Sequence, residues 1–488
     1  MRKIKVICEN QEYRKHITDI LYIFYLNKDI NVLTTTIVNE DELKLSADSD
    51  LLITNFSNGC VNMKYTVSEG TFYTVIDDIS ITKDRTKTIK KKIFSFINGI
   101  RKENLPWGFL TGVRPVKMVV NMLIQGNTPD FALEVLINDF LVDPMKARLI
   151  VYLAEKDLHL FGYDNVINDS VSVYISIPFC PDRCTYCSFS SYPYDKFGHM
   201  ADKYIDCLIV ELNKIKIGLI KENKYIRSIY IGGGTPAVLS TPLIDKLLNT
   251  VDSLCSDKST EVTFEAGRPE VFDDLKQKTV KKHNVTRICI NPQSLDDNIL
   301  KAIGRNHTVN DFYTCYNNAV KNGFGNINTD IIAGLPGETT HNYIKNLNEL
   351  LMLGQQSITV HTLAMKRKSI LIDNNNAQKI VNNKDIDEML EITESEFINK
   401  GFLPYYLYRQ KMSVGNRENI GYCKEGYECI YNMQMIGERH TVIGAGAGAT
   451  GRFVLSDATV TRNCNKKLID QYIADIENNK IQAGEINE

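Results

Sequence analysis

Short apolar runs alternate with longer helical patterns along the middle of the chain, between residues 166 and 375. The apolar runs are rich in β-branched residues, and we predict strands over 171–177, 226–231, 261–265, 287–291, 327–333 and 358–363. Between them apolar positions recur at helical spacing, as over 200–219 and 242–254. Strands alternating with helices indicate βαβ units and a parallel sheet. We therefore predict an α/β core, a partial (β/α)6 TIM-like barrel with its chemistry just after the strands.

The two flanking segments have mixed patterns. Residues 1–165 combine strand-like runs (3–8, 51–55, 72–76) with helical stretches (84–100, 131–160), which predicts an N-terminal α+β domain. Residues 376–488 contain a helix over 386–399, a tyrosine-rich strand over 403–409, a glycine/alanine loop over 444–451 and a last helix over 466–479. We expect this segment to be a C-terminal α+β lid or substrate domain over the open barrel.

Length and composition indicate a globular protein of about three domains, or of two with one of them large. The 488 residues are 43% hydrophobic and 24% charged, which excludes a largely disordered chain. The 57 basic and 59 acidic side chains nearly cancel, so we expect no nucleic-acid partner. The apolar runs, such as 20–26, are too short to span a membrane, and no apolar signal core follows the first basic residues. We expect a cytoplasmic protein.

Three of the twelve cysteines form a cluster in the sequence. Cys180, Cys184 and Cys187 follow the first predicted strand with the spacing CxxxCxxC, whereas the other nine are scattered. A structural zinc site needs four ligands, and no nearby residue completes this one. Three thiolates on one loop are suited to a four-iron cluster with one iron left open. The alternative is a set of three core or zinc-binding cysteines. Tyr186, just before the last cysteine, is placed to shield a cluster.

Polar or glycine-rich positions follow the other predicted strands. They are Gly232, Gly233, Gly234 and Thr235 after the second strand, Glu265 at the end of the third, Gln293 after the fourth with Arg305 and His307 twelve and fourteen residues on, Asp330 in the fifth and Ala364 after the sixth. Arginine is suited to a carboxylate and aspartate to paired hydroxyls. Simpler alternatives are a tight turn for the glycines, a solvated charge for Glu265, a helix cap for His307 and a packed strand residue for His361.

The cysteine spacing and the GGGTP turn resemble the radical S-adenosylmethionine (radical SAM) family. The resemblance implies a [4Fe-4S] cluster on Cys180, Cys184 and Cys187, whose open iron is chelated by SAM. One electron then splits a carbon–sulfur bond, and the 5′-deoxyadenosyl radical abstracts hydrogen from the substrate. The implied SAM contacts are Tyr174, Tyr186, Gly233, Gly234, Thr235, Glu265, Gln293, Arg305, Asp330 and Ala364. Tyr174 is also implied as a catalytic residue near the substrate; the alternative is a strand residue that points into the barrel.

The motifs match the subgroup that includes oxygen-independent coproporphyrinogen III oxidase. Two phrases outside the core, LTGVRPVK (110–117) and PYYLYRQKMSVGNRENIGY (404–422), resemble its HemZ-type coproporphyrinogen dehydrogenase branch. The resemblance implies porphyrin (haem) biosynthesis, in which two propionates of coproporphyrinogen III become vinyl groups and protoporphyrinogen IX is formed without oxygen. It also implies an electron donor such as flavodoxin or ferredoxin, and we expect a monomer.

Two other functions stay open. Phe189 stands where the oxidases carry a further cysteine, and the same Cys-x-Phe pattern occurs in related haem chaperones. The chaperones' His-Asn-x-x-Tyr-Trp motif is absent, and ERHTVIGAGAG contains only His440. The alternatives are therefore a haem-binding chaperone and a radical SAM enzyme on another substrate.

Cations and tyrosines outside the motifs are candidates for a tetrapyrrole pocket. They are Arg268, Arg409 and Lys411 for the propionates and Tyr406 and Tyr408 for the ring, and each has an alternative as an ordinary surface or packing residue. Cys423 and Cys429 are either a second metal site or ordinary thiols.

Overall fold

The structure is a computed structural model. It describes residues 3–8, 11–25, 30–33, 49–57, 60–76, 85–110, 112, 114–189, 191–255, 259–364, 383–410 and 413–478. The chain divides into two compact units. Unit 1 comprises Met1–Pro115, Gln125–Tyr152 and Gln410–Met412; unit 2 comprises Val116–Ile124, Leu153–Arg409 and Ser413–Glu488. The predicted boundaries near 165 and 375 remain a prediction.

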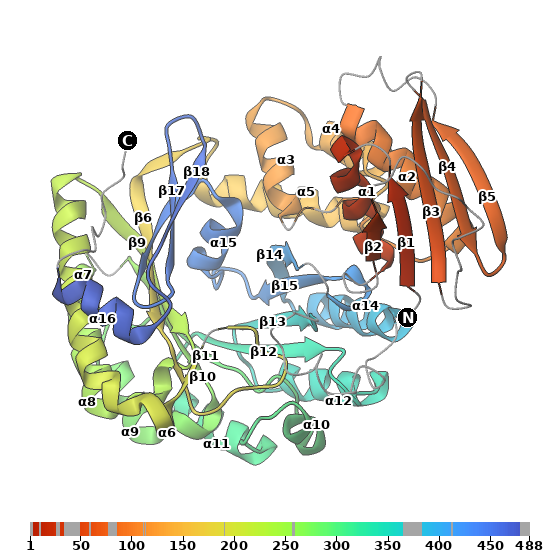
Figure 1. Ribbon diagram of the computed structural model, residues 1–488. Coiled ribbons are helices and arrows are strands. Elements are labelled where there is room, and N and C mark those ends of the chain that lie inside the picture. The colour runs from red at the N-terminus through yellow and green to blue at the C-terminus, as the bar shows by residue number, and fades with distance from the viewer. Residues whose placement is uncertain are drawn as a thin grey trace. The chain divides into compact units, whose positions relative to one another are not determined.

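Unit 1 contains a five-stranded sheet in the order β2-β1-β3-β4-β5 (Figure 1). Its strands are β1 (Lys3–Cys8), β2 (Ile30–Leu33), β3 (Ser49–Ser57), β4 (Cys60–Val67) and β5 (Gly70–Ile76). Its helices are α1 (Gln11–Phe24), α2 (Arg85–Arg101) and α4 (Pro129–Glu134); α3 (Pro115–Ile124) and α5 (Pro144–Phe161) have residues in both units. β1 pairs in parallel with β2 and β3, and β3, β4 and β5 pair antiparallel. The mixed α+β pattern predicted for this segment therefore forms a sheet with helices.

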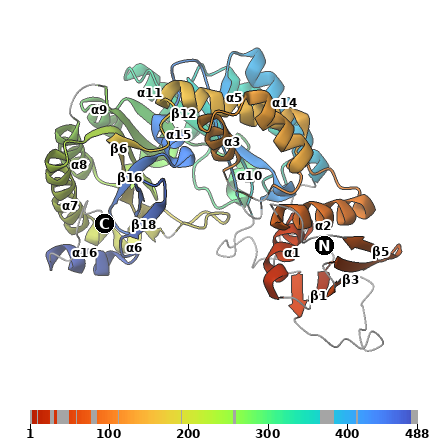
Figure 2. The same cartoon turned by 90° about the horizontal axis from the view of Figure 1, so that it is seen from above.

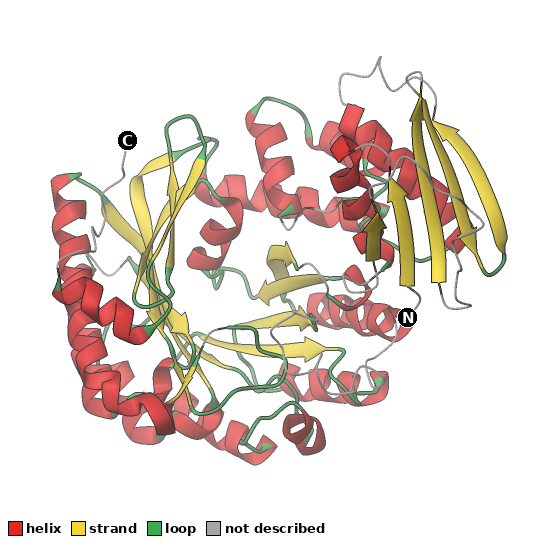
Figure 3. Cartoon of the chain, in the orientation of Figure 1, coloured by secondary structure: helices red, strands yellow, loops and turns green. Residues whose placement is uncertain are grey.

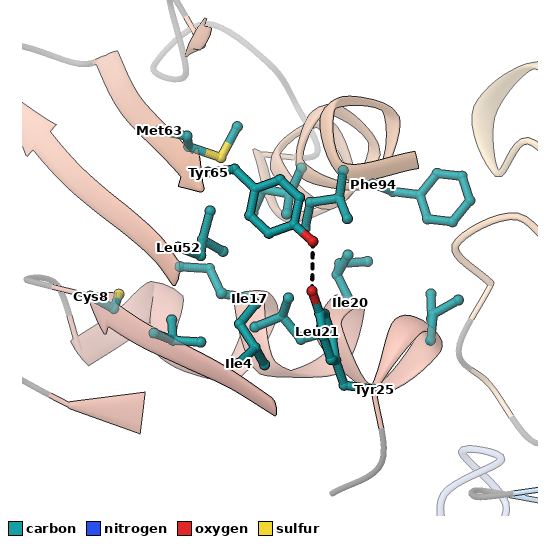
Figure 4. Packing of buried hydrophobic residues seen from close by; sticks show 14 of the residues in the cluster. Ile4, Cys8, Ile17, Ile20, Leu21, Tyr25, Leu52, Met63, Tyr65 and Phe94 are labelled. Carbon is teal, nitrogen blue, oxygen red and sulfur yellow. Dashed lines mark hydrogen bonds between the residues drawn. The ribbon is translucent and has the colours of Figure 1, made fainter. Parts of the chain in front are cut away.

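The core of unit 1 lies between α1, α2 and one face of the sheet. Every second residue of β4 is buried, and these residues pack with Ile17, Leu21 and Ile93 from the helices. Within this apolar core the Tyr25 and Tyr65 hydroxyls lie 2.6 Å apart (Figure 4). Tyr25 also donates a hydrogen bond to the buried Asp50 at 2.6 Å. The buried hydroxyls are thus satisfied, as burial in an apolar core requires.

Unit 2 is built on an eleven-stranded sheet in the order β14-β15-β13-β12-β11-β10-β9-β6-β16-β17-β18. The bounds are β6 (Ile167–Ile177), β9 (Tyr225–Gly233), β10 (Glu261–Gly267), β11 (Arg287–Ile290), β12 (Ile327–Ala333), β13 (Ser357–Thr362), β14 (Leu403–Arg409), β15 (Glu418–Cys423), β16 (His440–Ala445), β17 (Thr450–Val454) and β18 (Val460–Cys464). The six strands predicted for the core, β6 and β9–β13, are consecutive neighbours and all parallel. This confirms the partial TIM-like barrel, since the described residues form an open sheet without closure.

The helices of unit 2 lie mainly on the outside of the curved sheet. Figure 2 shows α7, α8, α9 and α11 in an arc around the strands, and Figure 3 shows the same separation of helices and strands. The bounds are α6 (Tyr194–Phe197), α7 (Ala201–Lys221), α8 (Thr241–Leu254), α9 (Asp274–Lys281), α10 (Asp297–Ala302), α11 (Val309–Lys321), α12 (Thr340–Leu351), α14 (Asn383–Asn399), α15 (Ile430–Gly437) and α16 (Ile469–Glu477).

Helix starts after β10, β11 and β12 are set by capping side chains. Asp273, Asp296, Thr308 and Thr339 each accept hydrogen bonds from backbone N–H groups in the first turn of the helix that follows. At Thr308 the capping box is complete, because Asp311 bonds back to the cap. These local sequence signals place each helix directly after a short loop at the carboxyl edge of the sheet.

The C-terminal segment extends the sheet at both edges. β14 and β15 add antiparallel strands beside β13, whereas β16 lies parallel to β6 and continues into β17 and β18. The loop predicted over 444–451 is wrong at its ends, because β16 reaches Ala445 and β17 begins at Thr450. A Cβ on Gly444 would lie 2.8 Å from the Gly451 nitrogen, so glycine permits this close pairing.

Across the described residues, no helix is both long and apolar enough to cross a membrane.

Candidate functional site

The cysteine loop begins where β6 ends. β7 (Phe179–Cys180) follows β6 after one residue and pairs with β8 (Tyr192–Pro193). Cys180, Cys184 and Cys187 are all half-buried, and the Cys187 N–H donates to the Cys184 carbonyl at 3.2 Å. No three His, Cys, Asp or Glu side chains converge on a single-ion site anywhere in the described ranges. An iron–sulfur cluster does not need such convergence, because its thiolates bind different iron atoms. The all-thiolate donor set on one loop therefore fits a cluster.

The glycines at the end of β9 and just after it allow that strand to lie against the cysteine loop. Gly233 has φ +108, a conformation that other residues rarely adopt. A Cβ on Gly234 would lie 2.3 Å from the Phe179 oxygen and 3.0 Å from the Cys180 sulfur. The Gly234 N–H donates to the Ile177 carbonyl at 2.7 Å, and Thr235 donates its hydroxyl to the Cys180 sulfur at 3.6 Å. The turn thus positions the first cysteine; its contact with SAM remains a prediction.

Glu265 lies two residues before the end of β10, against the glycine turn. A Cβ on Gly232 would lie 2.5 Å from its Oε2. Burial, together with the nearby negative charge of Asp330, raises the pKa of Glu265 to about 8, although a hydrogen bond from Tyr230 and the charge of Arg305 act in the opposite direction. The carboxyl is therefore mostly protonated at neutral pH, and it is not the solvated surface charge of the alternative interpretation.

Asp330 stays ionised although its side chain is only 16% exposed. Burial raises its pKa, but interactions with His361, Asn328 and Thr359 outweigh this and lower the pKa overall. Its Oδ2 lies 3.5 Å from His361 Nε2, and Asn328 donates to its Oδ1 at 2.7 Å. The Tyr408 hydroxyl forms a hydrogen bond of 3.2 Å with the other ring nitrogen of His361, Nδ1. His361 is thus an electrostatic partner of Asp330 as well as a strand residue.

Gln293 and Arg305 leave polar atoms without a protein partner. Gln293 has φ 69, and its backbone pairs with Asp330 and Ile332. The buried Gln293 Oε1 and Arg305 Nε have no hydrogen-bond partner among the described residues. Arg305 otherwise donates to the Asn291 carbonyl at 2.9 Å and to the Tyr186 hydroxyl at 3.1 Å. Since buried polar atoms are normally paired, these two fit a polar ligand at this edge.

Tyr174 lies in a cluster of three tyrosines. Its ring stacks with Tyr230 at 6.4 Å and with Tyr431 at 6.1 Å, and those two rings are 4.8 Å apart. Burial raises the pKa of Tyr174, so the phenol is neutral. Tyr230 lies two residues before Gly232, in the strand predicted over 226–231, whereas Tyr431 on α15 has no local signal in the sequence.

The cations considered for propionates are mostly engaged elsewhere. Arg268 is 3% exposed and binds the cysteine loop. Arg409 is buried, which lowers its pKa to about 10, and donates to the Asn416 carbonyl at 3.2 Å. The alternative interpretation of Arg268 and Arg409 as ordinary surface charges is therefore wrong, because both side chains are buried. Lys411 lies outside the described residues.

The remaining candidates lie around β13 and β14. Ala364 forms an isolated bridge with Ser413, and the Tyr406 and Tyr408 rings stack at 6.2 Å. Tyr406, Cys423 and Cys429 belong to one buried apolar cluster. Cys429 donates to Glu261 at 3.4 Å, which favours ordinary thiols over a second metal site.

The amino edge of the sheet is filled by a polar network. Arg287 at the start of β11 is fully buried and donates to Ser357 at 2.7 Å, to the Tyr427 carbonyl at 3.0 Å and to Asn328 at 3.1 Å. Glu261 at the start of β10 accepts the Ile430 N–H at 2.9 Å, which ties α15 to this edge. The amino edge of the sheet is thus closely packed and hydrogen-bonded, and the candidate site residues lie at the opposite, carboxyl edge.

Comparisons with known proteins point to one family. The sequence pattern of the Radical SAM superfamily matches residues 174–350. The oxygen-independent coproporphyrinogen-III oxidase-like protein HemZ of Bacillus subtilis is 36% identical over 364 residues, covering 74% of this chain and 73% of that protein. The heme chaperone HemW of the same organism is 30% identical over 307 residues, covering 61% and 75%.

A solved structure shares the fold. Coproporphyrinogen III oxidase (HemN) from Escherichia coli, described as a radical SAM enzyme, superposes with a TM-score of 0.51 at 17% identity, over 67% of this chain and 72% of that one. At this identity the likeness supports the fold alone.

Proposed function

The chain belongs to the radical SAM superfamily, among the oxygen-independent coproporphyrinogen-III oxidase-like proteins, and on that premise we propose that it is an enzyme of haem biosynthesis. The proposed reaction is the oxidative decarboxylation of two propionates of coproporphyrinogen III to vinyl groups, giving protoporphyrinogen IX without oxygen. The observation that carries the proposal is the 36% identity to the HemZ protein over 74% of this chain.

Membership of the superfamily implies a [4Fe-4S] cluster and SAM. We assign the cluster to Cys180, Cys184 and Cys187, and SAM to Tyr174, Tyr186, Gly233, Gly234, Thr235, Glu265, Gln293, Arg305, Asp330 and Ala364. Together the bound groups supply an organic radical that abstracts hydrogen from the substrate. The orphaned Gln293 Oε1 and Arg305 Nε support a polar ligand beside the cysteine loop.

The side chains around this site have distinct tasks in the proposal. Glu265, neutral at physiological pH, donates a proton in a hydrogen bond where an ionised carboxylate would only accept one. Asp330, ionised, accepts hydrogen bonds from paired hydroxyls. The stacked rings of Tyr174, Tyr230 and Tyr431 fill the space behind the site and exclude water, which protects a reactive intermediate from side reactions. Tyr174 is the proposed catalytic residue.

An anaerobic assay tests the proposal. The full chain is reconstituted with iron and sulfide and given SAM, a low-potential one-electron reductant and coproporphyrinogen III. We expect protoporphyrinogen IX, with 5′-deoxyadenosine formed in step. The proposed donor is a cytoplasmic flavodoxin or ferredoxin, and the proposed active form is a monomer. Deoxyadenosine without protoporphyrinogen would instead indicate a radical SAM enzyme with another substrate.

A haem chaperone is the second candidate. Phe189 follows Cys187 by two residues and is 64% exposed, in place of the further cysteine that the resembled oxidases carry. HemW, a heme chaperone, is 30% identical over 61% of the chain. This function predicts stoichiometric haem binding and no decarboxylation in the same preparation. Product formation without haem binding would exclude it.

A further inference from the structure

Arg268 is a buried cation directly beside a proposed cluster ligand. It comes directly after β10, and it is 3% exposed. Its Nη1 donates to the Cys184 sulfur at 3.1 Å, its Nη2 to Asp182 at 2.8 Å and its Nε to Glu270 at 2.7 Å. Burying a guanidinium costs several kcal/mol unless other groups compensate its charge. The two carboxylates do so, and they leave the third side of the planar group directed at the sulfur.

Two further contacts hold the cysteine loop against the rest of the barrel. The second oxygen of Asp182 accepts a hydrogen bond from Asn306, which follows α10. The Thr185 N–H donates to the Ile303 carbonyl at 3.0 Å. The loop is therefore tied to the connections after both β10 and β11, and Arg268 is the element that joins it to β10.

We propose that Arg268 is a positioning residue that orients Cys184 and raises the reduction potential of the cluster. The inference rests on the proposed assignment of the cluster to the three cysteines. A hydrogen bond to a ligand sulfur and a nearby positive charge both favour the reduced cluster, which carries one more negative charge. The step concerned is the uptake of one electron by the cluster from a one-electron reductant, with no bond broken.

The carboxylates beside Arg268 allow a test in which two substitutions should shift the reduction potential in opposite directions. Glu270 partly cancels the charge of Arg268, and it lies 3.5 Å from His307. An Arg268→Gln variant removes the cation and leaves Asp182 and Glu270 uncompensated, so the reduced cluster becomes less favourable. A Glu270→Gln variant removes a negative charge and keeps the Nη1–sulfur contact, so the reduced cluster becomes more favourable. The two substitutions therefore shift the potential in opposite directions.

The experiment is an anaerobic potentiometric titration of the reconstituted full chain with dithionite, followed by the EPR signal of the reduced cluster. At the potential where the parent cluster is half reduced, we expect Arg268→Gln to lower the ratio of reduced to oxidised cluster about tenfold, which is 59 mV for one electron. We expect Glu270→Gln to raise that ratio. Arg268→Lys keeps the charge, so we expect its ratio of reduced to oxidised cluster to lie between those of the parent and of Arg268→Gln. Arg462→Gln, at an exposed arginine on β18, leaves the ratio unchanged.

The outcomes separate this inference from the function on which it rests. A parent chain that binds no iron overturns the cluster assignment itself. If the parent chain binds the cluster and Arg268→Gln has the same reduction potential as the parent, the proposed role of Arg268 is overturned. If Arg268→Gln fails to bind the cluster, Glu270→Gln and Arg268→Lys test the proposal instead. A merely structural role of Arg268 leaves the reduction potentials of both variants at the parental value.

Discussion

Replacing Gly234 by alanine tests whether the close approach of β9 to the cysteine loop positions Cys180. The added Cβ would lie 2.3 Å from the Phe179 oxygen and 3.0 Å from the Cys180 sulfur. Real Cβ atoms essentially never come within 3.0 Å of another heavy atom, so the loop or the strand must retreat by about 0.7 Å. The atom that is met is backbone, which cannot rotate away as a flexible side chain can.

We expect two measurable consequences. Overpacking of this kind costs about 1–3 kcal/mol, so the free energy of unfolding of the cluster-free chain in urea should fall by that amount. The shift also strains the Gly234 N–H bond to the Ile177 carbonyl, now 2.7 Å, and moves Cys180 with the loop. The iron and sulfide bound per chain after anaerobic reconstitution should therefore fall several-fold.

The matched control is Gly325→Ala, since Gly325 has no heavy atom within 4 Å of an added Cβ and an ordinary backbone conformation. We expect it to match the parent in both measurements. Parental iron content and an unchanged free energy of unfolding in Gly234→Ala would refute the reasoning, because the loop would then accommodate a methyl group without displacing Cys180.

Three further predictions concern the cluster, the base of the sheet and pH. Cys184→Ala should abolish both bound iron and turnover, whereas the exposed Cys464→Ala should change neither; retained turnover would refute the ligand assignment. Arg287→Leu leaves Ser357, Asn328 and the Tyr427 carbonyl without their buried donor and should lower the free energy of unfolding by about 1–3 kcal/mol; an unchanged value in urea would contradict this. Burial raises the pKa of Glu338 from 4.5 to about 8, so the folded chain keeps this proton where the unfolded chain releases it, and stability falls as pH rises between these values. Glu338→Gln should make that fall shallower in urea unfolding at pH 5 and pH 8, and an identical slope would argue against the raised pKa.

Much of the architecture follows from local patterns. The six parallel strands of the core were predictable because strands buried on both faces are continuous apolar runs. Capping residues such as Asp296 and Thr308 mark where the following helices begin. The cysteine spacing and the glycine turn are also local, since each consists of neighbouring residues on one loop. The sequence by itself therefore determined the core, its functional edge and the family.

Only the tertiary structure decided which distant side chains meet at that edge. Arg268 was a candidate for substrate propionates, yet its partner is Cys184, 84 residues earlier. Tyr431 stacks on Tyr174 and Tyr230 because α15 is tied to the start of β10, and nothing near residue 431 in the sequence indicates this. The pattern of one strand records which of its faces are buried. It does not record which neighbour supplies the opposing side chain, because that depends on strand order, register and the curvature of the whole sheet.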